Sequence, residues 1–167
     1  MTRVLVSSCL LGQPVRHDGV SRPCGHPVLA RWMEEGRVVP FCPEVAAGMA
    51  VPRDPAEIGA GAHGSEVLAG RAKVLDAGGG DLSALFVAGA RLALERALEA
   101  GVRAAVLKDG SPSCGVTVIC DGTFTSTRRS NAGVTAALLA QAGIPVFSED
   151  QLDAADAWLG PDRPEPG

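Results

Sequence analysis

Short runs of aliphatic and β-branched residues recur along the chain, with longer segments between them. Runs of this length, bounded by glycine, proline or polar residues, are typical of strands that a sheet buries on both faces. They cover residues 3–7, 37–41, 71–75, 102–107 and 146–147. A further apolar segment, VTVIC, ends at Cys120 just before an Asp121-Gly122 turn and predicts one more strand.

The segments between these runs carry helical signals. The longest predicted helix begins after Asp81, which can cap it, continues with apolar residues at helical spacing, and ends at Gly101. Further helices are predicted over residues 26–35 and 131–142, and from Ser148 onward, with Gln151 at the capping-box position.

This alternation of strand and helix predicts an α/β fold. We expect a single three-layer domain over residues 1–159, with a mainly parallel sheet flanked by helices. Residues 54–70 are polar and glycine-rich and are expected to form a long irregular excursion. Residues 160–167 are expected to form a disordered, proline-rich tail. In parallel sheets ligands bind beyond the carboxyl ends of the strands, so residues that follow the strands are of most interest.

Composition narrows the class of protein. With 46% hydrophobic and 20% charged residues the chain is globular, and no apolar run is long enough for a membrane span. We expect a cytoplasmic protein, a monomer or small homo-oligomer. A net charge of −4 argues against a stable nucleic-acid complex. Five cysteines, none in a C-x-x-C pair, argue against a disulfide framework and for a metal-binding or catalytic use.

Three of the cysteines stand where strands end. Cys9 and Cys42 follow the first two predicted strands, and Cys114 lies in the loop after residues 102–107. If these strands are parallel, the three thiols converge on one edge of the sheet. The alternative for each is a small buried apolar residue, which suits Cys120 best.

Three thiolates are compatible with two kinds of metal site. Zinc prefers four sulfur and nitrogen ligands, so it would add a histidine, for which the candidates are His17, His26 and His63. An iron–sulfur cluster with three thiolates keeps one iron open for chemistry. Spacing alone does not choose between them.

Polar residues beside these cysteines are candidates for chemistry. Glu44 in CPE can act as a general acid or base, or can be a helix N-terminal charge. Ser111 and Ser113 in SPSCG can shape a loop or hydrogen-bond a substrate. Lys108 ends a buried strand, where it faces either the site or solvent. The loops after the first two cysteines carry residues that can pair with each other or bind a polar ligand, namely Arg16, Asp18 and Arg53.

Taken in order, the motifs SSCLLG, RHDG, FCPE, VPRDPAEI, LKDGSPSCG and GIPVFSED resemble the DUF523 family over nearly the whole folded chain. That family includes thiouracil desulfidase. The resemblance implies a cytosolic bacterial enzyme with an oxygen-sensitive [4Fe-4S] cluster. It also implies a small thiolated nucleobase as the partner molecule.

The resemblance assigns roles by motif. The implied cluster ligands are Cys9, Cys42 and Cys114. Glu44 is then the acid/base, and one of the two serines of SPS assists it, with Ser111 preferred. From the residues themselves, Ser113 and Lys108 are the candidates to bind substrate. The implied reaction is a non-redox hydrolysis of 2- or 4-thiouracil to uracil. In it the open iron receives the thiocarbonyl sulfur, water adds to the carbon, and sulfide is released.

One motif departs from the family pattern. Many members have CLLGxxCRYDG, whereas Val15 and His17 replace the second cysteine and the tyrosine in this chain, and Cys24 is a nearby candidate substitute. Two other functions stay open at this point. One is a zinc-stabilised α/β protein without desulfidase activity, and the other is a desulfidase that acts on tRNA.

Overall fold

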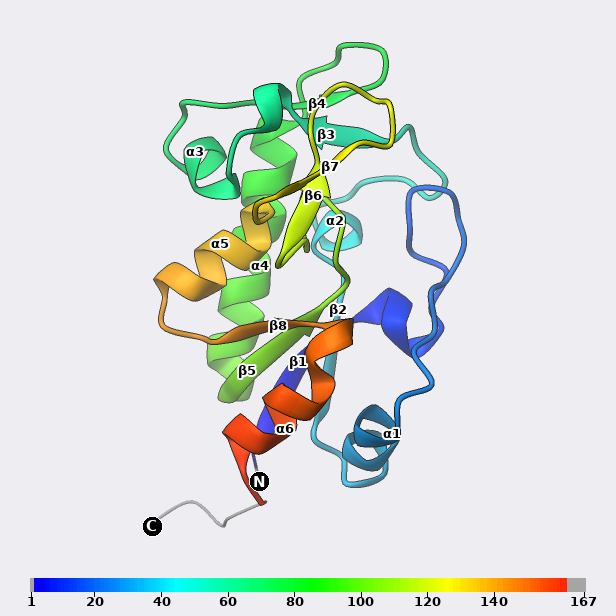
Figure 1. The fold of residues 1–167 in the computed structure, drawn as a ribbon, viewed down its shortest axis with the longest axis vertical. Helices are drawn as coiled ribbons and strands as arrows, with labels where there is room; N and C mark the ends of the chain where they lie inside the picture. The colour runs from blue at the N-terminus through cyan, green and yellow to red at the C-terminus, as the bar shows by residue number, and fades with distance from the viewer. Residues whose placement is uncertain (1, 162–167) are drawn as a thin grey trace.

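A four-stranded parallel sheet forms the centre of the computed structural model, which describes residues 2–161. The strand order is β2-β1-β5-β8, and every neighbouring pair is parallel. The strands are β1 (Arg3–Ser7), β2 (Val38–Phe41), β5 (Val102–Leu107) and β8 (Val146–Ser148). Four of the predicted strands are thereby confirmed, and they form the sheet seen in the lower half of Figure 1.

Helices cover both faces of this sheet, as predicted. Alternate residues Val4 and Val6 of β1 pack in one core cluster with Trp32. The intervening Leu5 packs in a second cluster with Leu139. The first face is covered by α1 (Pro27–Glu34) and α6 (Leu152–Leu159), and the second by α4 (Ser83–Ala100) and α5 (Val134–Gln141). The period-two burial of β1 produces the expected three layers.

Local capping signals place the helix ends. Gly101 ends α4 in the left-handed region, with φ of 64°. Ser148 and Gln151 form a complete capping box at the start of a 3₁₀ turn, η3 (Glu149–Gln151), which leads into α6. Both predictions are confirmed. The helix predicted over residues 131–142 starts later, at Val134, because Gly133 lies against the backbone of a neighbouring loop.

The predicted excursion over residues 54–70 is wrong, because regular elements occupy most of it. They are β3 (Ala56–Ile58), η2 (Gly59–Gly61) and α3 (Gly64–Leu68). The strand predicted over residues 71–75 is β4 (Val74–Asp76), which pairs antiparallel with β3 outside the central sheet. Ile58 and Val74 are fully buried in a third core cluster, so tertiary packing rather than local pattern orders this segment.

A second small sheet was only half expected. The apolar segment ending at Cys120 forms β6 (Val118–Cys120), which pairs antiparallel with β7 (Arg128–Ser130). The loop between them spans residues 121–127 and is longer than the expected two-residue turn. All three residues of β7 are exposed, and they carry no hydrophobic pattern that predicts a strand.

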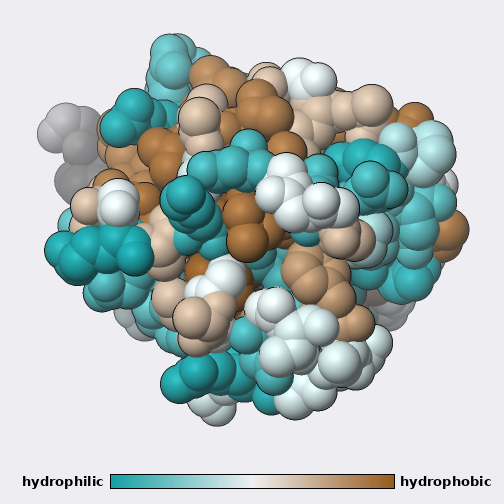
Figure 2. Space-filling model, turned by 90° about the horizontal axis from the view of Figure 1, so that it is seen from above, coloured by the Kyte–Doolittle hydropathy of each residue, from teal (hydrophilic) through white to brown (hydrophobic). Residues whose placement is uncertain are grey.

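The surface is mixed in character. Figure 2 views the molecule from the end that carries β3 and β4 and shows hydrophilic residues interspersed with apolar ones. No helix within residues 2–161 is both long and apolar enough to cross a membrane. Of the predicted tail, residues 162–167 lie outside the described part of the chain.

The carboxyl edge of the sheet is where the chain changes direction. From β1 the chain crosses by α1 to β2, while β5 connects through α5, on the other face, to β8. Neighbouring strands β1 and β5 therefore lead away in opposite directions. Such a switch point opens a crevice in which α/β proteins bind ligands.

Close packing fixes one wall of this crevice. Helix α2 (Pro43–Ala46) follows β2 directly and rests on α4. A Cβ atom at Gly89 of α4 would lie 2.5 Å from the carbonyl oxygen of Pro43. Only glycine at this helical position lets the two backbones approach so closely.

We expect Gly89→Ala to destabilise the protein. Helix propensity alone would stabilise it by about 1 kcal/mol, but the backbone clash costs about 1–3 kcal/mol and also moves α2. Thermal unfolding should show a lower midpoint than wild type, whereas Ala88→Gly, at an exposed neighbouring position, should lose only the propensity difference. A raised midpoint for Gly89→Ala would contradict the close approach.

Candidate active site

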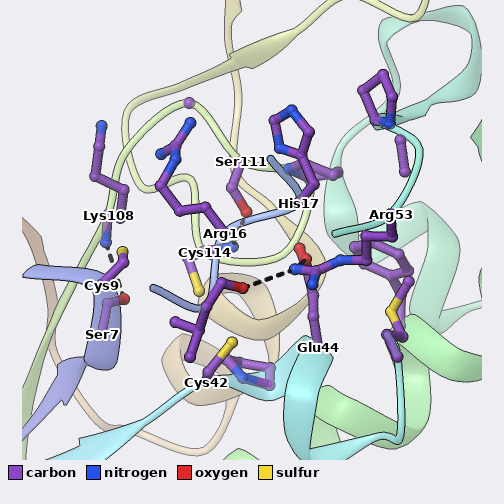
Figure 3. Close-up of a pocket in the computed structure, with 18 of the residues that line it drawn as sticks. Ser7, Cys9, Arg16, His17, Cys42, Glu44, Arg53, Lys108, Ser111 and Cys114 are labelled. Carbon is purple, nitrogen blue, oxygen red and sulfur yellow. Dashed lines mark hydrogen bonds and ion pairs between the residues drawn. The ribbon is translucent and has the colours of Figure 1, made fainter. Parts of the chain in front are cut away.

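A pocket of about 210 Å³ opens at the carboxyl edge of the sheet. It is lined by the loops that follow β1, β2 and β5, together with residues of α2, α4 and the β6–β7 hairpin. Three of its lining residues are Cys9, Cys42 and Cys114, which come from three different loops (Figure 3). The predicted convergence of these thiols on one edge is therefore what the structure shows.

Cys9 lies in a 3₁₀ turn, η1 (Ser8–Leu11), directly after β1. Its side chain is buried, and this burial raises the pKa of the thiol. Arg16 and Lys108 act in the opposite direction, because positive charge stabilises a thiolate, while nearby Cys42 raises the pKa further. Arg16 and Lys108 thus lie close enough to the sulfur of Cys9 to favour its thiolate form.

Cys42 occupies the residue before α2. Burial raises the pKa of its thiol, and the nearby backbone amides of Val45 and Glu44 lower it. Pro43 occupies the first helical position, so these amides follow it in the first turn of α2. Backbone N–H groups beside a sulfur stabilise a metal-bound thiolate, so the CPE motif places Cys42 favourably as a ligand.

Cys114 is buried to about the same extent as Cys9. Burial strongly raises the pKa of its thiol, and the neighbouring Cys42, Glu44 and Cys9 raise it further. A hydrogen bond with the hydroxyl of Ser7 acts in the opposite direction. The hydroxyl oxygen of Ser7 accepts a hydrogen bond from the backbone N–H of Lys108 at 3.0 Å, so the hydroxyl proton is free to be donated to another acceptor. The three sulfurs are thus close enough to influence one another electrostatically.

The loop that carries Cys114 is organised around one buried carboxylate. Oδ1 of Asp109 accepts hydrogen bonds from the amides of Val116, Thr117 and Val118 at 2.8–3.2 Å. Oδ2 accepts the hydroxyl proton of Thr117. Burial raises the pKa of Asp109, but these hydrogen bonds outweigh it, so the pKa lies below its ordinary value. The ionised carboxylate of Asp109 is therefore the form that stabilises this loop.

Ser111 is arranged as a hydrogen-bond donor toward the pocket. Its Oγ accepts the backbone amides of Ser113 at 3.0 Å and Cys114 at 2.9 Å. A hydroxyl oxygen has two lone pairs, and both are used here. Any further hydrogen bond from Ser111, which lines the pocket, must therefore be one that it donates.

Glu44 projects from α2 into the same pocket and forms an ion pair with Arg53. Their side chains are 16% and 10% exposed, so the pair is largely withdrawn from solvent. Arg53 binds through Oε2 of the carboxylate, and Oε1 receives no hydrogen bond from residues 2–161. One carboxylate oxygen of this pocket-lining residue is thereby fixed, and the other is left without a hydrogen bond to the described residues.

Two predicted substrate-binding residues are differently placed. Ser113 is 1% exposed and does not line the pocket; its hydroxyl shares a hydrogen bond with Thr135 of α5. The expectation that Ser113 binds substrate is corrected, because its side chain bonds to α5 and stabilises the loop on the side away from the pocket. Lys108 does line the pocket, with its ammonium donating to Glu149 at 2.8 Å and to the carbonyl of Asp109 at 3.0 Å.

Other candidates divide in the same way. Of the three histidines only His17 lines the pocket, since the other two cap α1 and α3. Cys24 packs against the core beside α1, whereas Cys120 lies on the pocket wall. Nε of Arg16 is buried without a hydrogen-bond partner among residues 2–161 and lies 4.0 Å from Asp18. Sequence reasoning missed Ser7 and Asp109, although both adjoin the cysteine motifs.

We expect Asp109→Asn to lower the free energy of unfolding by about 2 kcal/mol at pH 7, since hydrogen bonds to a charged group are lost. Because the folded pKa lies below the unfolded value of about 3.9, this stabilisation is present above that value and is lost as the pH falls through the folded pKa. Urea unfolding of both proteins should therefore show a gap at pH 7 that narrows at pH 3.

Asp153→Asn is the matched control, because Asp153 is 87% exposed and its substitution should shift stability by less than about 0.5 kcal/mol. A gap between wild type and Asp109→Asn that stays constant with pH would contradict the charged-carboxylate account.

Comparison with known proteins places this geometry in context. Residues 4–151 match the model of a family described as 2-thiouracil desulfurase. A Bacillus subtilis (strain 168) protein, uncharacterized protein YbbK, is 42% identical over 150 residues, which cover 90% of this chain and 97% of that protein. A solved structure of TudS, a [4Fe-4S]-dependent thiouracil desulfidase, is 45% identical with a TM-score of 0.83, over 92% of this chain and 95% of that one. By sequence and by fold, this chain belongs to the 2-thiouracil desulfurase (DUF523) family.

Proposed function

We propose that this protein is a [4Fe-4S]-dependent desulfidase that hydrolyses a thiolated pyrimidine, such as 2- or 4-thiouracil, to uracil and sulfide. The observation that carries this proposal is the convergence of three thiols, two of them buried and that of Cys42 half-buried, from three separate loops on one pocket that also presents Glu44 and Ser111. Membership of the family and the likeness to TudS support it.

The donor set fits an iron–sulfur cluster. Cys9, Cys42 and Cys114 would hold it, leaving one iron without a protein thiolate. Within residues 2–161, no three His, Cys, Asp or Glu side chains are placed to hold one metal ion. Zinc–sulfur bonds of about 2.3 Å would draw three thiolates tightly together. The zinc-stabilised alternative is therefore not favoured.

When bound, such a cluster supplies a Lewis-acidic iron for the thiocarbonyl sulfur. The residues of the chain supply proton transfer. Glu44 lines the pocket, and its Oε1, which Arg53 does not bind, takes a proton from the attacking water, whose oxygen forms a bond to the ring carbon. Ser111 donates a hydrogen bond to a ring acceptor and so stabilises the charge that develops on the ring. The carbon–sulfur bond breaks and sulfur leaves as sulfide, with no net oxidation.

The pocket suits a small planar ring. Phe41, Met49 and Phe86 contribute apolar walls, and a pocket of about 210 Å³ that must also hold the cluster has room for a small ring rather than a folded polynucleotide. We therefore propose a small thiolated nucleobase as substrate, without a stable nucleic-acid complex. We also propose a cytoplasmic location, because all five cysteines are free thiols, as a reducing compartment keeps them.

Anaerobic reconstitution with iron and sulfide tests the ligand set. Wild type should become brown, with broad visible absorbance, and Cys9→Ser, Cys42→Ser and Cys114→Ser should each lose most of that absorbance because a thiolate ligand is missing. Cys24→Ser is the control and should load normally, since Cys24 lies outside the pocket. A colourless wild type that holds one zinc ion per chain would support the structural-metal alternative instead.

Glu44→Gln and Ser111→Ala test proton transfer. Both should retain the visible absorbance, while turnover of 2-thiouracil falls by about 10²–10⁴-fold for Glu44→Gln. Ser111→Thr keeps a hydroxyl and should be faster than Ser111→Ala. Glu66→Gln, at an exposed ion pair, should be unaffected. Undiminished turnover by Glu44→Gln would move the acid/base role to another residue.

Comparing free 2-thiouracil, free 4-thiouracil and a tRNA that contains 4-thiouridine tests the substrate class. The free bases should be the substrates and the tRNA should not, since a pocket that also holds the cluster has room only for a small ligand.

A further inference from the structure

Arg53 is the most heavily bonded cation in the pocket. It lies between α2 and β3, and its guanidinium is almost withdrawn from solvent, with 10% of the side chain exposed. Nη2 donates to Glu44 Oε2 and, at 3.2 Å, to the carbonyl of Val15. Nη1 donates to the carbonyl of Ala50 at 3.0 Å. One guanidinium therefore bridges the loop after Cys9, the helix after Cys42 and the segment that follows it.

The backbone of Arg53 adds a second tie. Its amide donates to the carbonyl of His17 at 2.7 Å. Side chain and main chain together hold the segment Val15–His17 at two points, and this segment carries Arg16 and His17 into the pocket (Figure 3). The pocket wall contributed by the first loop is thus anchored to the same residue that binds Glu44.

The distribution of donors shows what Arg53 does. A guanidinium has five N–H donors in a fixed plane, and three of its hydrogen bonds go to protein oxygens. Arg16 differs, because its Nε has no hydrogen-bond partner among residues 2–161. Arg53 therefore directs three of its five donors at the protein, one of them at Glu44, through which it can act on the reaction.

Holding one carboxylate oxygen has a geometric consequence. A glutamate side chain has three rotatable bonds, and a free carboxylate on the short helix α2 would sample several positions. With Oε2 bound to Arg53, Oε1 is the carboxylate oxygen left without a hydrogen bond among residues 2–161, and Glu44 lines the pocket. Rates fall by about 10²-fold when a reacting group is displaced by roughly 1 Å, so this restraint matters for the reaction.

We propose that Arg53 is a positioning residue for desulfidation, which fixes the Glu44 carboxylate in one orientation and anchors the segment Val15–His17 over it. This inference rests on the function proposed above. Arg53 forms no bond to the substrate and transfers no proton.

The kinetic test compares cluster-loaded wild type with Arg53→Ala and Arg53→Lys. We expect kcat of Arg53→Ala for 2-thiouracil to fall by about 10²-fold, with KM changed less than kcat and with unchanged visible absorbance per chain. Added guanidinium ion should restore part of the lost rate, because it can occupy the vacated site beside Glu44. Arg53→Lys should lie between the two, since one ammonium cannot bond three separated oxygens.

Arg71→Ala is the matched control. Arg71 also pairs with a glutamate, Glu66, but at an exposed position outside the pocket, with 66% of its side chain accessible. It should leave kcat and KM unchanged. A rise in KM of Arg53→Ala with unchanged kcat would show that Arg53 binds substrate directly and would overturn the proposal. Unchanged kinetics, or a complete absence of guanidinium rescue, would also overturn it.

A second measurement does not depend on turnover. Amide hydrogen exchange of the peptide covering residues 12–20 should accelerate in Arg53→Ala and not in Arg71→Ala, because the anchor on Val15 is lost. If wild type loads a cluster but turns over no thiouracil, the proposed function fails, and this exchange still reports on the anchoring role. Equal exchange rates in wild type and Arg53→Ala would overturn the anchor even where kcat falls.

Discussion

Parallel pairing of β1 with β2 on one side and β5 on the other is the constraint on which the site depends. Because the three strands run in the same direction, each delivers its following loop to the same edge of the sheet. The register pairs Leu5 with both Val39 and Ala105, so the strands also end at nearly the same height. Cysteines far apart in the chain thereby become neighbours around one pocket.

Charge around the pocket is closely compensated. Glu44 is bound by Arg53, Lys108 by Glu149, and Asp109 by a set of backbone amides. Each of these groups is partly or wholly buried, and an unpaired buried charge would be expensive. These ion pairs and hydrogen bonds consequently connect neighbouring loops. The groups that remain available for the reaction are the thiols, the oxygen of Glu44 that Arg53 does not bind, and the hydroxyl proton of Ser111.

Much of the central fold could be predicted from local pattern. The strand at residues 102–107 has the predicted bounds, and the capping box at Ser148 is complete, because each depends on a few adjacent residues. The small sheets could be predicted only in part, because β4 and β6 were expected as strands but their partners β3 and β7 were not. Ile58 of β3 stands in polar, glycine-rich sequence, and β7 is entirely exposed. Their pairing follows from contacts distant in sequence, on which local periodicity carries no information.

In the candidate site, too, features set by local sequence position could be predicted, and features set by contacts distant in sequence could not. Convergence of the three cysteines followed from the position of each after a strand. The loop interior did not, because SPSCG gives no sign that Ser113 turns toward α5 while Ser111 faces the pocket. Likewise the partner of Glu44 lies nine residues away, across a turn, and its choice of Arg53 depends on how that turn folds back.

The distance in sequence between the sulfurs has a consequence for biogenesis. Cys114 follows β5, the last of the three strands to be synthesised, and reaches the other two cysteines only once β5 has paired with β1. Such non-local pairing is a late event, since the intervening chain must first be closed into a loop. A nascent chain still on the ribosome would lack the complete set of thiolates until most of its length had emerged. The complete set of three thiolates therefore exists only once the sheet has assembled, which couples formation of the cluster site to folding of the chain.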